Sequence, residues 1–144
     1  MSLLSPRKIK HRKQQKGRRK GLGIATSRID VSYGGFGLRS MSNCWITARQ
    51  IESARVAISK VIAKTKGSRI FIRVFPDKPV TNHGNESVMG SGKGALDHYV
   101  AVIKPGMMLF EVDGVTEDVA KRAFLRAKYK LPVETKFAKK EIMW

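Results

Sequence analysis

A few residues of this chain could carry out chemistry, and their spacing argues against catalysis. Gly92-Lys93 resembles the end of a phosphate-binding P-loop. That motif needs Gly where Ser87 stands and Ser or Thr where Gly94 stands, so both of its ends fail. We therefore expect no nucleotide-hydrolysing site.

Histidine and cysteine offer no better candidates for metal binding or nucleophilic attack. His11, His83 and His98 are far apart, and none has a ligand partner at helical or hairpin spacing. The single cysteine, Cys44, has no identifiable base and cannot form an internal disulfide or a Cys-pair zinc site. The sequence predicts no catalytic residue, no metal and no cofactor.

Lysine and arginine are the charged side chains that the chain carries in excess. Its 144 residues include 29 Lys and Arg against 11 Asp and Glu, a formal net charge of +18. This excess favours a polyanionic partner, usually nucleic acid, because phosphates relieve the repulsion between cations. An anionic membrane is the alternative, but no apolar run approaches the roughly 18 residues that span a bilayer. We expect no membrane partner.

The first 28 residues contain ten basic side chains and no acidic one. Glycines interrupt any helix there and apolar side chains are sparse, so residues 1–28 are predicted to be a tail that orders on a partner. A merely solubilising tail and a cleaved transit peptide are alternatives. We favour phosphate binding, because lysine clusters with glycine do not make the amphipathic helix of a transit peptide.

Residues 29–144 have the length of one domain. Glycines at 34, 35 and 37 suggest short strands with a bend. We expect the strands before and after Pro105-Gly106 to form a hairpin. Runs rich in β-branched and aromatic residues predict strands over 69–75, 98–103, 107–112 and 133–137.

Two amphipathic helices are also predicted. The first begins at a capping box of Thr47 and Gln50 and ends at Gly67. The second begins at Thr116, with acidic residues in its first turn and basic residues in its last turns. These elements predict an α+β fold in which two helices pack on a mixed, mainly antiparallel sheet.

The stretch 76–97 is predicted to be a long exposed loop. It has four glycines and almost no large apolar side chain, so it cannot bury itself. Lys78 and Lys93 stand there among glycines and hydroxyls, which lets ammonium groups and backbone N–H groups approach phosphates. A loop this long in a small domain is usually functional.

Three motifs resemble those of a known family, large ribosomal subunit protein sixteen of bacterial and organellar ribosomes. They are Thr47-Ala48-Arg49-Gln50-Ile51-Glu52, Ile72-Arg73-Val74-Phe75-Pro76-Asp77-Lys78-Pro79 and Met89-Gly90-Ser91-Gly92-Lys93-Gly94, and the likeness covers nearly the whole chain. Two positions depart from the family pattern. Phe71 replaces the usual Trp, and Val88 replaces an arginine that some members carry in hydroxylated form, so that modification is not expected here.

The resemblance implies a hammerhead-like fold and a structural, non-enzymatic role in the large ribosomal subunit. It implies binding to 23S-type rRNA, late entry during assembly, and help in organising the aminoacyl-tRNA site near the peptidyl transferase centre. Neighbouring ribosomal proteins are implied partners, no homo-oligomer is expected, and the ribosome would be that of a bacterial cytoplasm, a plastid or a mitochondrial matrix.

The resemblance and the charge pattern together define two sets of candidate residues. The residues expected to bind rRNA are Arg7, Lys8, Lys10, His11, Arg12, Lys13, Lys16, Arg18, Arg19, Lys20, Arg39, Arg49, Lys60 and Arg73. The residues expected near tRNA are Lys78, Met89, Gly90, Ser91, Gly92, Lys93 and Gly94.

Two functions from other classes remain open. A free RNA chaperone or nucleic-acid-condensing protein would share the charge but would need no structured domain. A small nucleotide-using enzyme would need a saturable nucleotide site, which the incomplete P-loop argues against.

Overall fold

The computed structural model describes residues 4–17 and 23–140, which form two helices and seven strands. Predicted tail residues Arg18, Arg19 and Lys20 lie outside the described residues. The elements in chain order are β1 (Phe36–Ser40), β2 (Cys44–Thr47), α1 (Ala48–Ile62), β3 (Arg69–Ile72), β4 (Lys78–Asn82), β5 (Ala95–Ile103), β6 (Met108–Asp113), α2 (Glu117–Lys128) and β7 (Thr135–Lys139).

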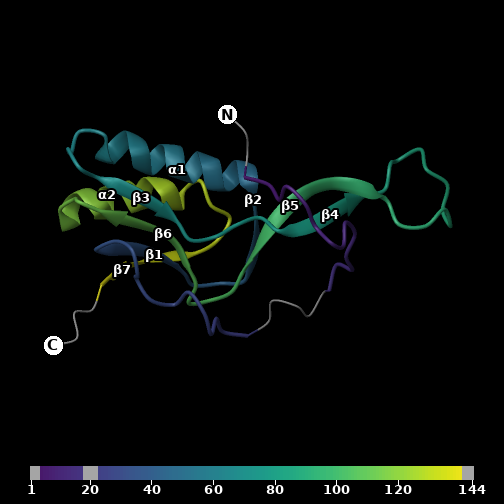
Figure 1. Ribbon diagram of the computed structural model, residues 1–144, viewed down its shortest axis with the longest axis horizontal. Coiled ribbons are helices and arrows are strands. Elements are labelled where there is room, and N and C mark those ends of the chain that lie inside the picture. Colours follow the sequence, from purple (N-terminus) through teal and green to yellow (C-terminus); the bar gives the residue numbers. More distant parts are fainter. Residues whose placement is uncertain (1–3, 18–22, 141–144) are drawn as a thin grey trace.

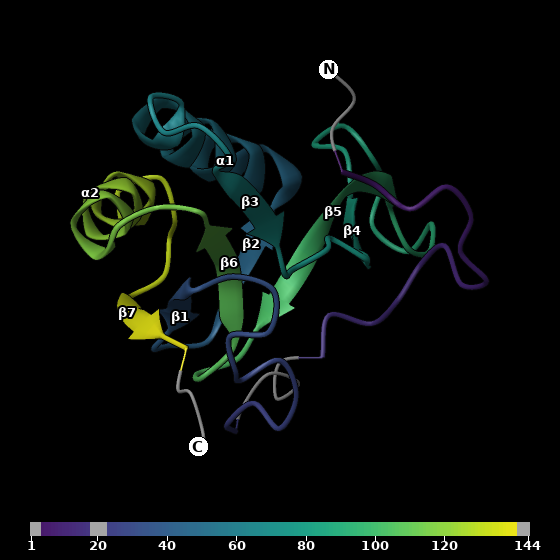
Figure 2. The same ribbon diagram turned by 60° about the vertical axis from the view of Figure 1, so that its left-hand side comes forward.

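The strands form two sheets. One has the order β3-β6-β1-β7 and the other the order β2-β5-β4. Helix α2 contacts β1 and β7 of the four-stranded sheet, whereas α1 contacts β3 of that sheet and β2 and β5 of the other. Strands β4 and β5 project from the body as a two-stranded arm (Figures 1 and 2). The predicted α+β class is confirmed. The prediction of a mixed sheet is corrected, because every strand pair within residues 4–17 and 23–140 is antiparallel.

The prediction that the strands before and after Pro105-Gly106 form a hairpin is wrong. β5 pairs with β2 and β4, whereas β6 pairs with β1 and β3, so the turn carries the chain from one sheet to the other. The turn is fixed by other segments: Ala25 N–H donates to the Pro105 carbonyl at 2.9 Å, and Gly106 N–H donates to the Ser40 carbonyl at 2.8 Å. Each of these two strands therefore pairs with strands that are distant in sequence and not with its neighbour along the chain.

Helix α1 confirms the predicted capping box. Gln50 N–H donates to the Thr47 hydroxyl at 3.3 Å, and Thr47 N–H donates to the Gln50 side-chain oxygen at 2.9 Å. The helix ends at Ile62, earlier than expected, and the Ile62 carbonyl there accepts a hydrogen bond from the Ser68 hydroxyl at 3.1 Å. The predicted terminator Gly67 lies in the following turn, with a φ of +81°.

Helix α2 begins after the predicted N-cap Thr116, although the Thr116 side chain makes no capping hydrogen bond. Its buried residues are Ala120, Ala123, Phe124 and Ala127. Three of the four are alanines, and small side chains let a helix approach its neighbour closely. Helix α2 packs against α1, and this pair covers the sheet (Figure 2).

The arm corrects the predicted loop at 76–97. Backbone pairing from Lys78↔Val100 to Asn82↔Ala95 makes the ends of that stretch into strands, which leaves residues 83–94 as the connecting loop. Pro79 is tolerated because β4 is an edge strand of its sheet. The prediction failed because strand pairing, rather than apolar side chains, supports this segment.

Candidate nucleic-acid interface

The described part of the tail exposes every candidate side chain that it carries. Residues 4–17 form no helix or strand. Within the described ranges none of their cations takes part in an ion pair. Exposed cations of this kind are available to phosphates. These exposed side chains are Arg7, Lys8, Lys10, His11, Arg12, Lys13 and Lys16.

Two hydrogen bonds hold the tail beside the β4–β5 arm. The Lys13 ammonium donates to the Lys93 carbonyl at 3.1 Å, and the Lys78 ammonium donates to the Lys16 carbonyl at 3.0 Å. The tail runs next to the arm in both views of the molecule (Figures 1 and 2). The structure thus brings together the two candidate sets, tail and loop, which are far apart in sequence.

Lys78 lies at the base of the arm and not in the loop where it was expected. It is the first residue of β4 and is only 9% exposed. Its ammonium nitrogen lies 4.9 Å from the centroid of the Trp45 ring, a geometry that the ring quadrupole stabilises. With its charge between that ring and the Lys16 carbonyl, Lys78 anchors the tail.

The loop at the end of the arm is exposed to solvent, including its apolar side chains Val88 and Met89. Gly90 and Gly92 have φ values of +96° and +85°, a left-handed conformation that other residues rarely adopt. Gly94 is required for space, because a Cβ there would lie 2.4 Å from the Asn82 carbonyl oxygen. The exposed residues of the tip include Met89, Gly90, Ser91, Gly92 and Lys93.

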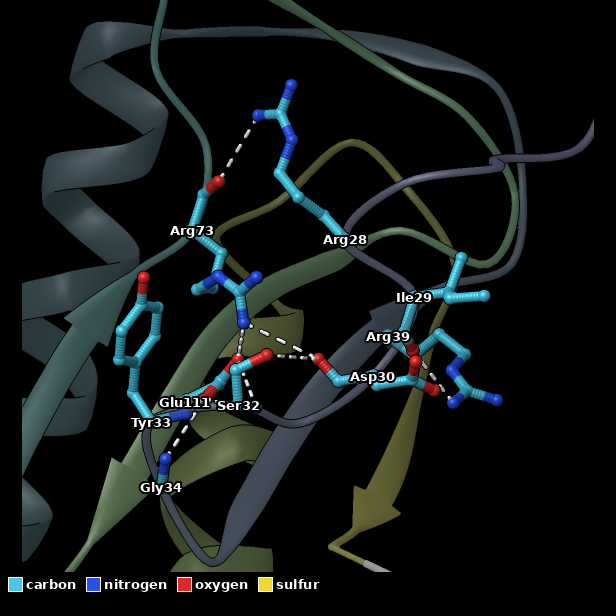
Figure 3. A network of polar contacts seen from close by, with 9 residues as sticks. All are labelled: Arg28, Ile29, Asp30, Ser32, Tyr33, Gly34, Arg39, Arg73 and Glu111. Carbon is cyan, nitrogen blue, oxygen red and sulfur yellow. Dashed lines mark hydrogen bonds and ion pairs between the residues drawn. The ribbon is translucent and has the colours of Figure 1, made fainter.

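Arg73 is held inside a network around the buried Glu111 (Figure 3). The Glu111 carboxylate accepts N–H groups of Ser32, Tyr33 and Gly34 at 3.1, 2.6 and 2.9 Å. It also forms an ion pair with the Arg73 guanidinium, which in turn lies 4.9 Å from the Tyr33 ring centroid. Arg73 therefore joins β3 to the segment before β1, and these contacts occupy the side chain predicted to bind rRNA.

The environment of Glu111 keeps its carboxylate charged. Burial by itself raises the pKa of this group. The N–H groups of Tyr33, Gly34 and Ser32 and the Arg73 guanidinium outweigh that effect, so the pKa of Glu111 is lowered overall. A buried carboxylate with four such partners is a structural group that fixes the turn at 32–34.

The other three domain candidates occupy different surroundings. Arg39 is half-buried and donates to the Ile29 carbonyl at 3.0 Å (Figure 3). Arg49 and Lys60 are exposed near opposite ends of α1. The domain cations thus do not form a single cluster with the tail.

The described residues hold no group of three or more His, Cys, Asp or Glu that could bind a metal ion. Cys44 donates weakly to the Trp45 and Pro132 carbonyls. Burial raises the pKa of the Cys44 thiol more than its bond to Trp45 lowers it, so the thiol is protonated at neutral pH. In the part of the chain that is described, no helix is long and apolar enough to cross a bilayer.

Sequence reasoning missed two features of this surface. The approach of Lys13 to Lys93 left no signal, because a contact between a tail and a distant loop follows no local periodicity. Glu111 did leave a signal in the sequence, because it is a lone carboxylate inside the apolar run 107–112. A charge at such a position requires partners when the run is buried.

The chain is similar to known proteins over nearly its whole length. The family model described as Ribosomal protein L16p/L10e matches residues 6–138. One similar curated protein is "Large ribosomal subunit protein uL16" of Sulfurihydrogenibium sp. (strain YO3AOP1), 53% identical over 139 residues that cover 96% of this chain and 98% of the relative. The resemblance seen in the sequence motifs is confirmed, and the chain belongs to the ribosomal protein L16p/L10e family.

Proposed function

We propose that this chain is a structural component of the large ribosomal subunit that binds 23S-type rRNA. In this proposal it joins late in assembly, and its arm approaches tRNA and helps to organise the aminoacyl-tRNA site. It performs no catalysis. Its partners are rRNA, tRNA and neighbouring ribosomal proteins.

The observation that carries this proposal is the meeting of the tail with the tip of the arm. The Lys13–Lys93 contact adds an exposed, glycine-rich loop to a tail that carries no acidic residue. The result is one extended surface whose positive charge comes chiefly from the tail, because Lys78 and Lys93 of the arm are offset by Asp77, Glu86 and Asp97. Such a surface suits a crowded phosphate backbone better than a small ligand, which a pocket would enclose.

The action of this surface is electrostatic and architectural. Ammonium and guanidinium groups neutralise phosphates and release counterions, and the folded domain fixes the position of the RNA segments that it contacts. The paired strands of the arm hold its loop away from the body, so the loop can reach a ligand that the domain does not touch (Figure 1).

The test is sedimentation of a cell lysate followed by detection of this chain in the gradient fractions. We expect one copy per large subunit, with release on RNase treatment or at high salt. Each neutralised phosphate contributes about 0.7–0.9 to the slope of log K against log salt, so six to ten contacts lose about a thousandfold or more in affinity between low and moderate salt. A chain found free in the cytosol, with a salt-insensitive partner, would contradict the proposal.

The same gradient distinguishes the alternative function. A free RNA chaperone or nucleic-acid-condensing protein would spread over many RNA species with variable stoichiometry. The buried network around Glu111 and the capped helix α1 favour the structural role, because a condensing protein needs no such rigid domain.

A further inference from the structure

A basic groove runs between the two helices, away from the tail and the arm. Ser53 of α1 lines the groove together with Tyr129, the residue after α2. Lys64, two residues after α1, lines it together with Val119 near the start of α2, so the helices run antiparallel along the groove. Two adjoining depressions of about 520 and 420 Å³ share Lys60 and Arg126. We call this surface the helix groove. Its cationic lining residues are Lys60, Lys64, Arg122, Arg126 and Lys130.

The helix groove carries positive charge without compensation. No Asp or Glu lines either depression. None of the five cations forms an ion pair with any residue in 4–17 or 23–140. Nearby glutamates are engaged elsewhere, Glu52 with Arg55 and Glu117 with Lys121 and Lys139.

Fold stability does not explain this arrangement. Arg122 and Arg126 lie four residues apart on α2, where like charges destabilise a helix. Cations near a helix C-terminus are favoured by the helix dipole, which accounts for Lys60 and Arg126. It does not account for Arg122, which is in the middle of α2. Asp118 stands four residues before Arg122 on α2 but forms no ion pair with it among the described residues, so an external anion would relieve the repulsion across the groove.

We propose that the helix groove binds the phosphate backbone of an RNA segment other than the one held by the tail. Two arginines give the groove the planar donors that engage phosphate oxygens in pairs. Tyr129, 77% exposed at the rim, offers a ring on which a ribose or an unpaired base can stack. This inference rests on the proposed function, because it requires an RNA-bound chain, and it adds a second RNA surface to it.

The position of the groove gives the molecule a bridging role. The loop of the arm lies at one end of the molecule and α2 lies toward the other end (Figure 1), whereas α1 contacts both α2 and β5. An RNA segment in the helix groove and another along the tail would therefore be held apart at a separation set by the rigid domain between them. The chain would fix the relative placement of two RNA segments.

The first experiment measures the reactivity of lysines in the full-length protein toward an acylating reagent, with mass spectrometry as the readout. Lys60 and Lys64 should react in the free protein, become protected in assembled large subunits, and react again after nuclease digestion. Protection that survives nuclease would show a protein occupant, such as an acidic partner, and would overturn the RNA assignment. Reactivity that persists in the subunit would show that the groove faces solvent.

The second experiment compares two variants of equal charge. Lys60→Gln with Arg126→Gln removes two groove cations, whereas Lys66→Gln with Lys128→Gln removes two exposed cations that do not line the groove. For binding to large-subunit rRNA, the groove variant should lower the slope of log K against log salt by about 0.7–0.9 per lost contact, and the control by much less. Equal slopes for both variants would overturn the inference.

These outcomes separate the inference from the proposed function. A wild-type chain that does not enter the large subunit contradicts the proposed function itself. A chain that enters while its groove lysines stay reactive contradicts only the second RNA surface.

Discussion

At the residue scale, Glu111 shows how one charged side chain organises a fold that otherwise carries excess positive charge. Its side chain is fully buried, and its partners come from the turn at 32–34 and from Arg73 after β3 (Figure 3). An ion pair of this kind can be neutral in net stability when both partners are present. It becomes costly to break, because one buried charge then lacks a partner.

Glu111→Gln should therefore destabilise the domain by about 3 kcal/mol, the lower end of the range for breaking a buried pair, since the Arg73 side chain keeps 12% exposure. The measurement is the free energy of unfolding in urea at neutral pH. Glu52→Gln is the matched control, because its partner Arg55 is on the surface, and it should cost less than about 1 kcal/mol. Similar losses of unfolding free energy for the two variants would show that breaking the buried Glu111 network costs no more than breaking a surface ion pair.

The same carboxylate predicts a pH dependence of stability. The pKa of Glu111 is lower in the folded protein than the ordinary glutamate value of 4.5, so the unfolded chain binds the proton more readily. The stabilisation is complete above that value and is lost as the pH falls through the folded pKa. Urea unfolding between neutral and acid pH should show a decline for the wild type that is smaller for Glu111→Gln. Parallel profiles would contradict this assignment.

At the scale of elements, the β4–β5 arm and the tail act as one unit. The Lys78 ammonium lies between the Trp45 ring and the Lys16 carbonyl, so a residue of the strand positions a segment that has no regular structure of its own. Strand pairing makes the arm rigid enough for this. The arrangement orders cations before RNA arrives, which lowers the entropy cost of binding.

Lys78→Met should release the tail while leaving the fold intact, because it removes the ammonium and keeps the apolar stem. Hydrogen exchange of the amides in residues 4–17 should become faster, with helix amides unchanged. Lys93→Met is the matched control, because Lys93 contacts the tail through its backbone carbonyl, which the substitution retains. Faster tail exchange in both variants, or in neither, would show that Lys78 is not the anchor.

The connecting loop has a separate prediction. Replacing residues 84–94 by a short uncharged turn, or changing Lys93→Ala, should leave entry into the large subunit intact and weaken tRNA binding. We expect a loss on the order of 1 kcal/mol per phosphate contact at a wet, salt-screened site. The measurement is tRNA affinity of purified ribosomes at matched salt. Normal affinity after removal of the whole loop would show that the loop is only a connector.

At the scale of the whole molecule, a small folded domain carries cations on two sides, the tail with the arm and the helix groove. The core between them is built from both sheets and both helices. Its rigidity is what makes a fixed separation between bound RNA segments possible. The tail contributes charge to this design and little to the core, apart from Ala25, which is buried in the core, and Leu4, which packs against it.

Deletion of residues 1–20 should leave a folded domain and weaken its incorporation into the large subunit. The deletion removes nine basic side chains and little buried apolar area. It also removes the Lys16 partner of Lys78, so a loss of about 1–3 kcal/mol in stability is expected. Circular dichroism checks the fold, and sedimentation checks incorporation. An unfolded truncated protein would show that the tail belongs to the domain.

The sequence by itself determined the features that depend on neighbours within a few residues. The Thr47–Gln50 capping box, the amphipathic character of both helices, the fold class and the family motifs were all readable from it, because helix periodicity and caps are local. Charge composition alone indicated a polyanionic partner.

Only the tertiary structure decided which distant segments meet. It paired β5 with β2 and β4 in place of the expected hairpin with β6, and it turned the ends of the predicted loop into strands. It also placed Lys78 under the tail and brought Lys60 opposite Arg126. These contacts join residues far apart in sequence. Strand pairing and the pairing of charges have no sequence periodicity, so no local pattern could predict them.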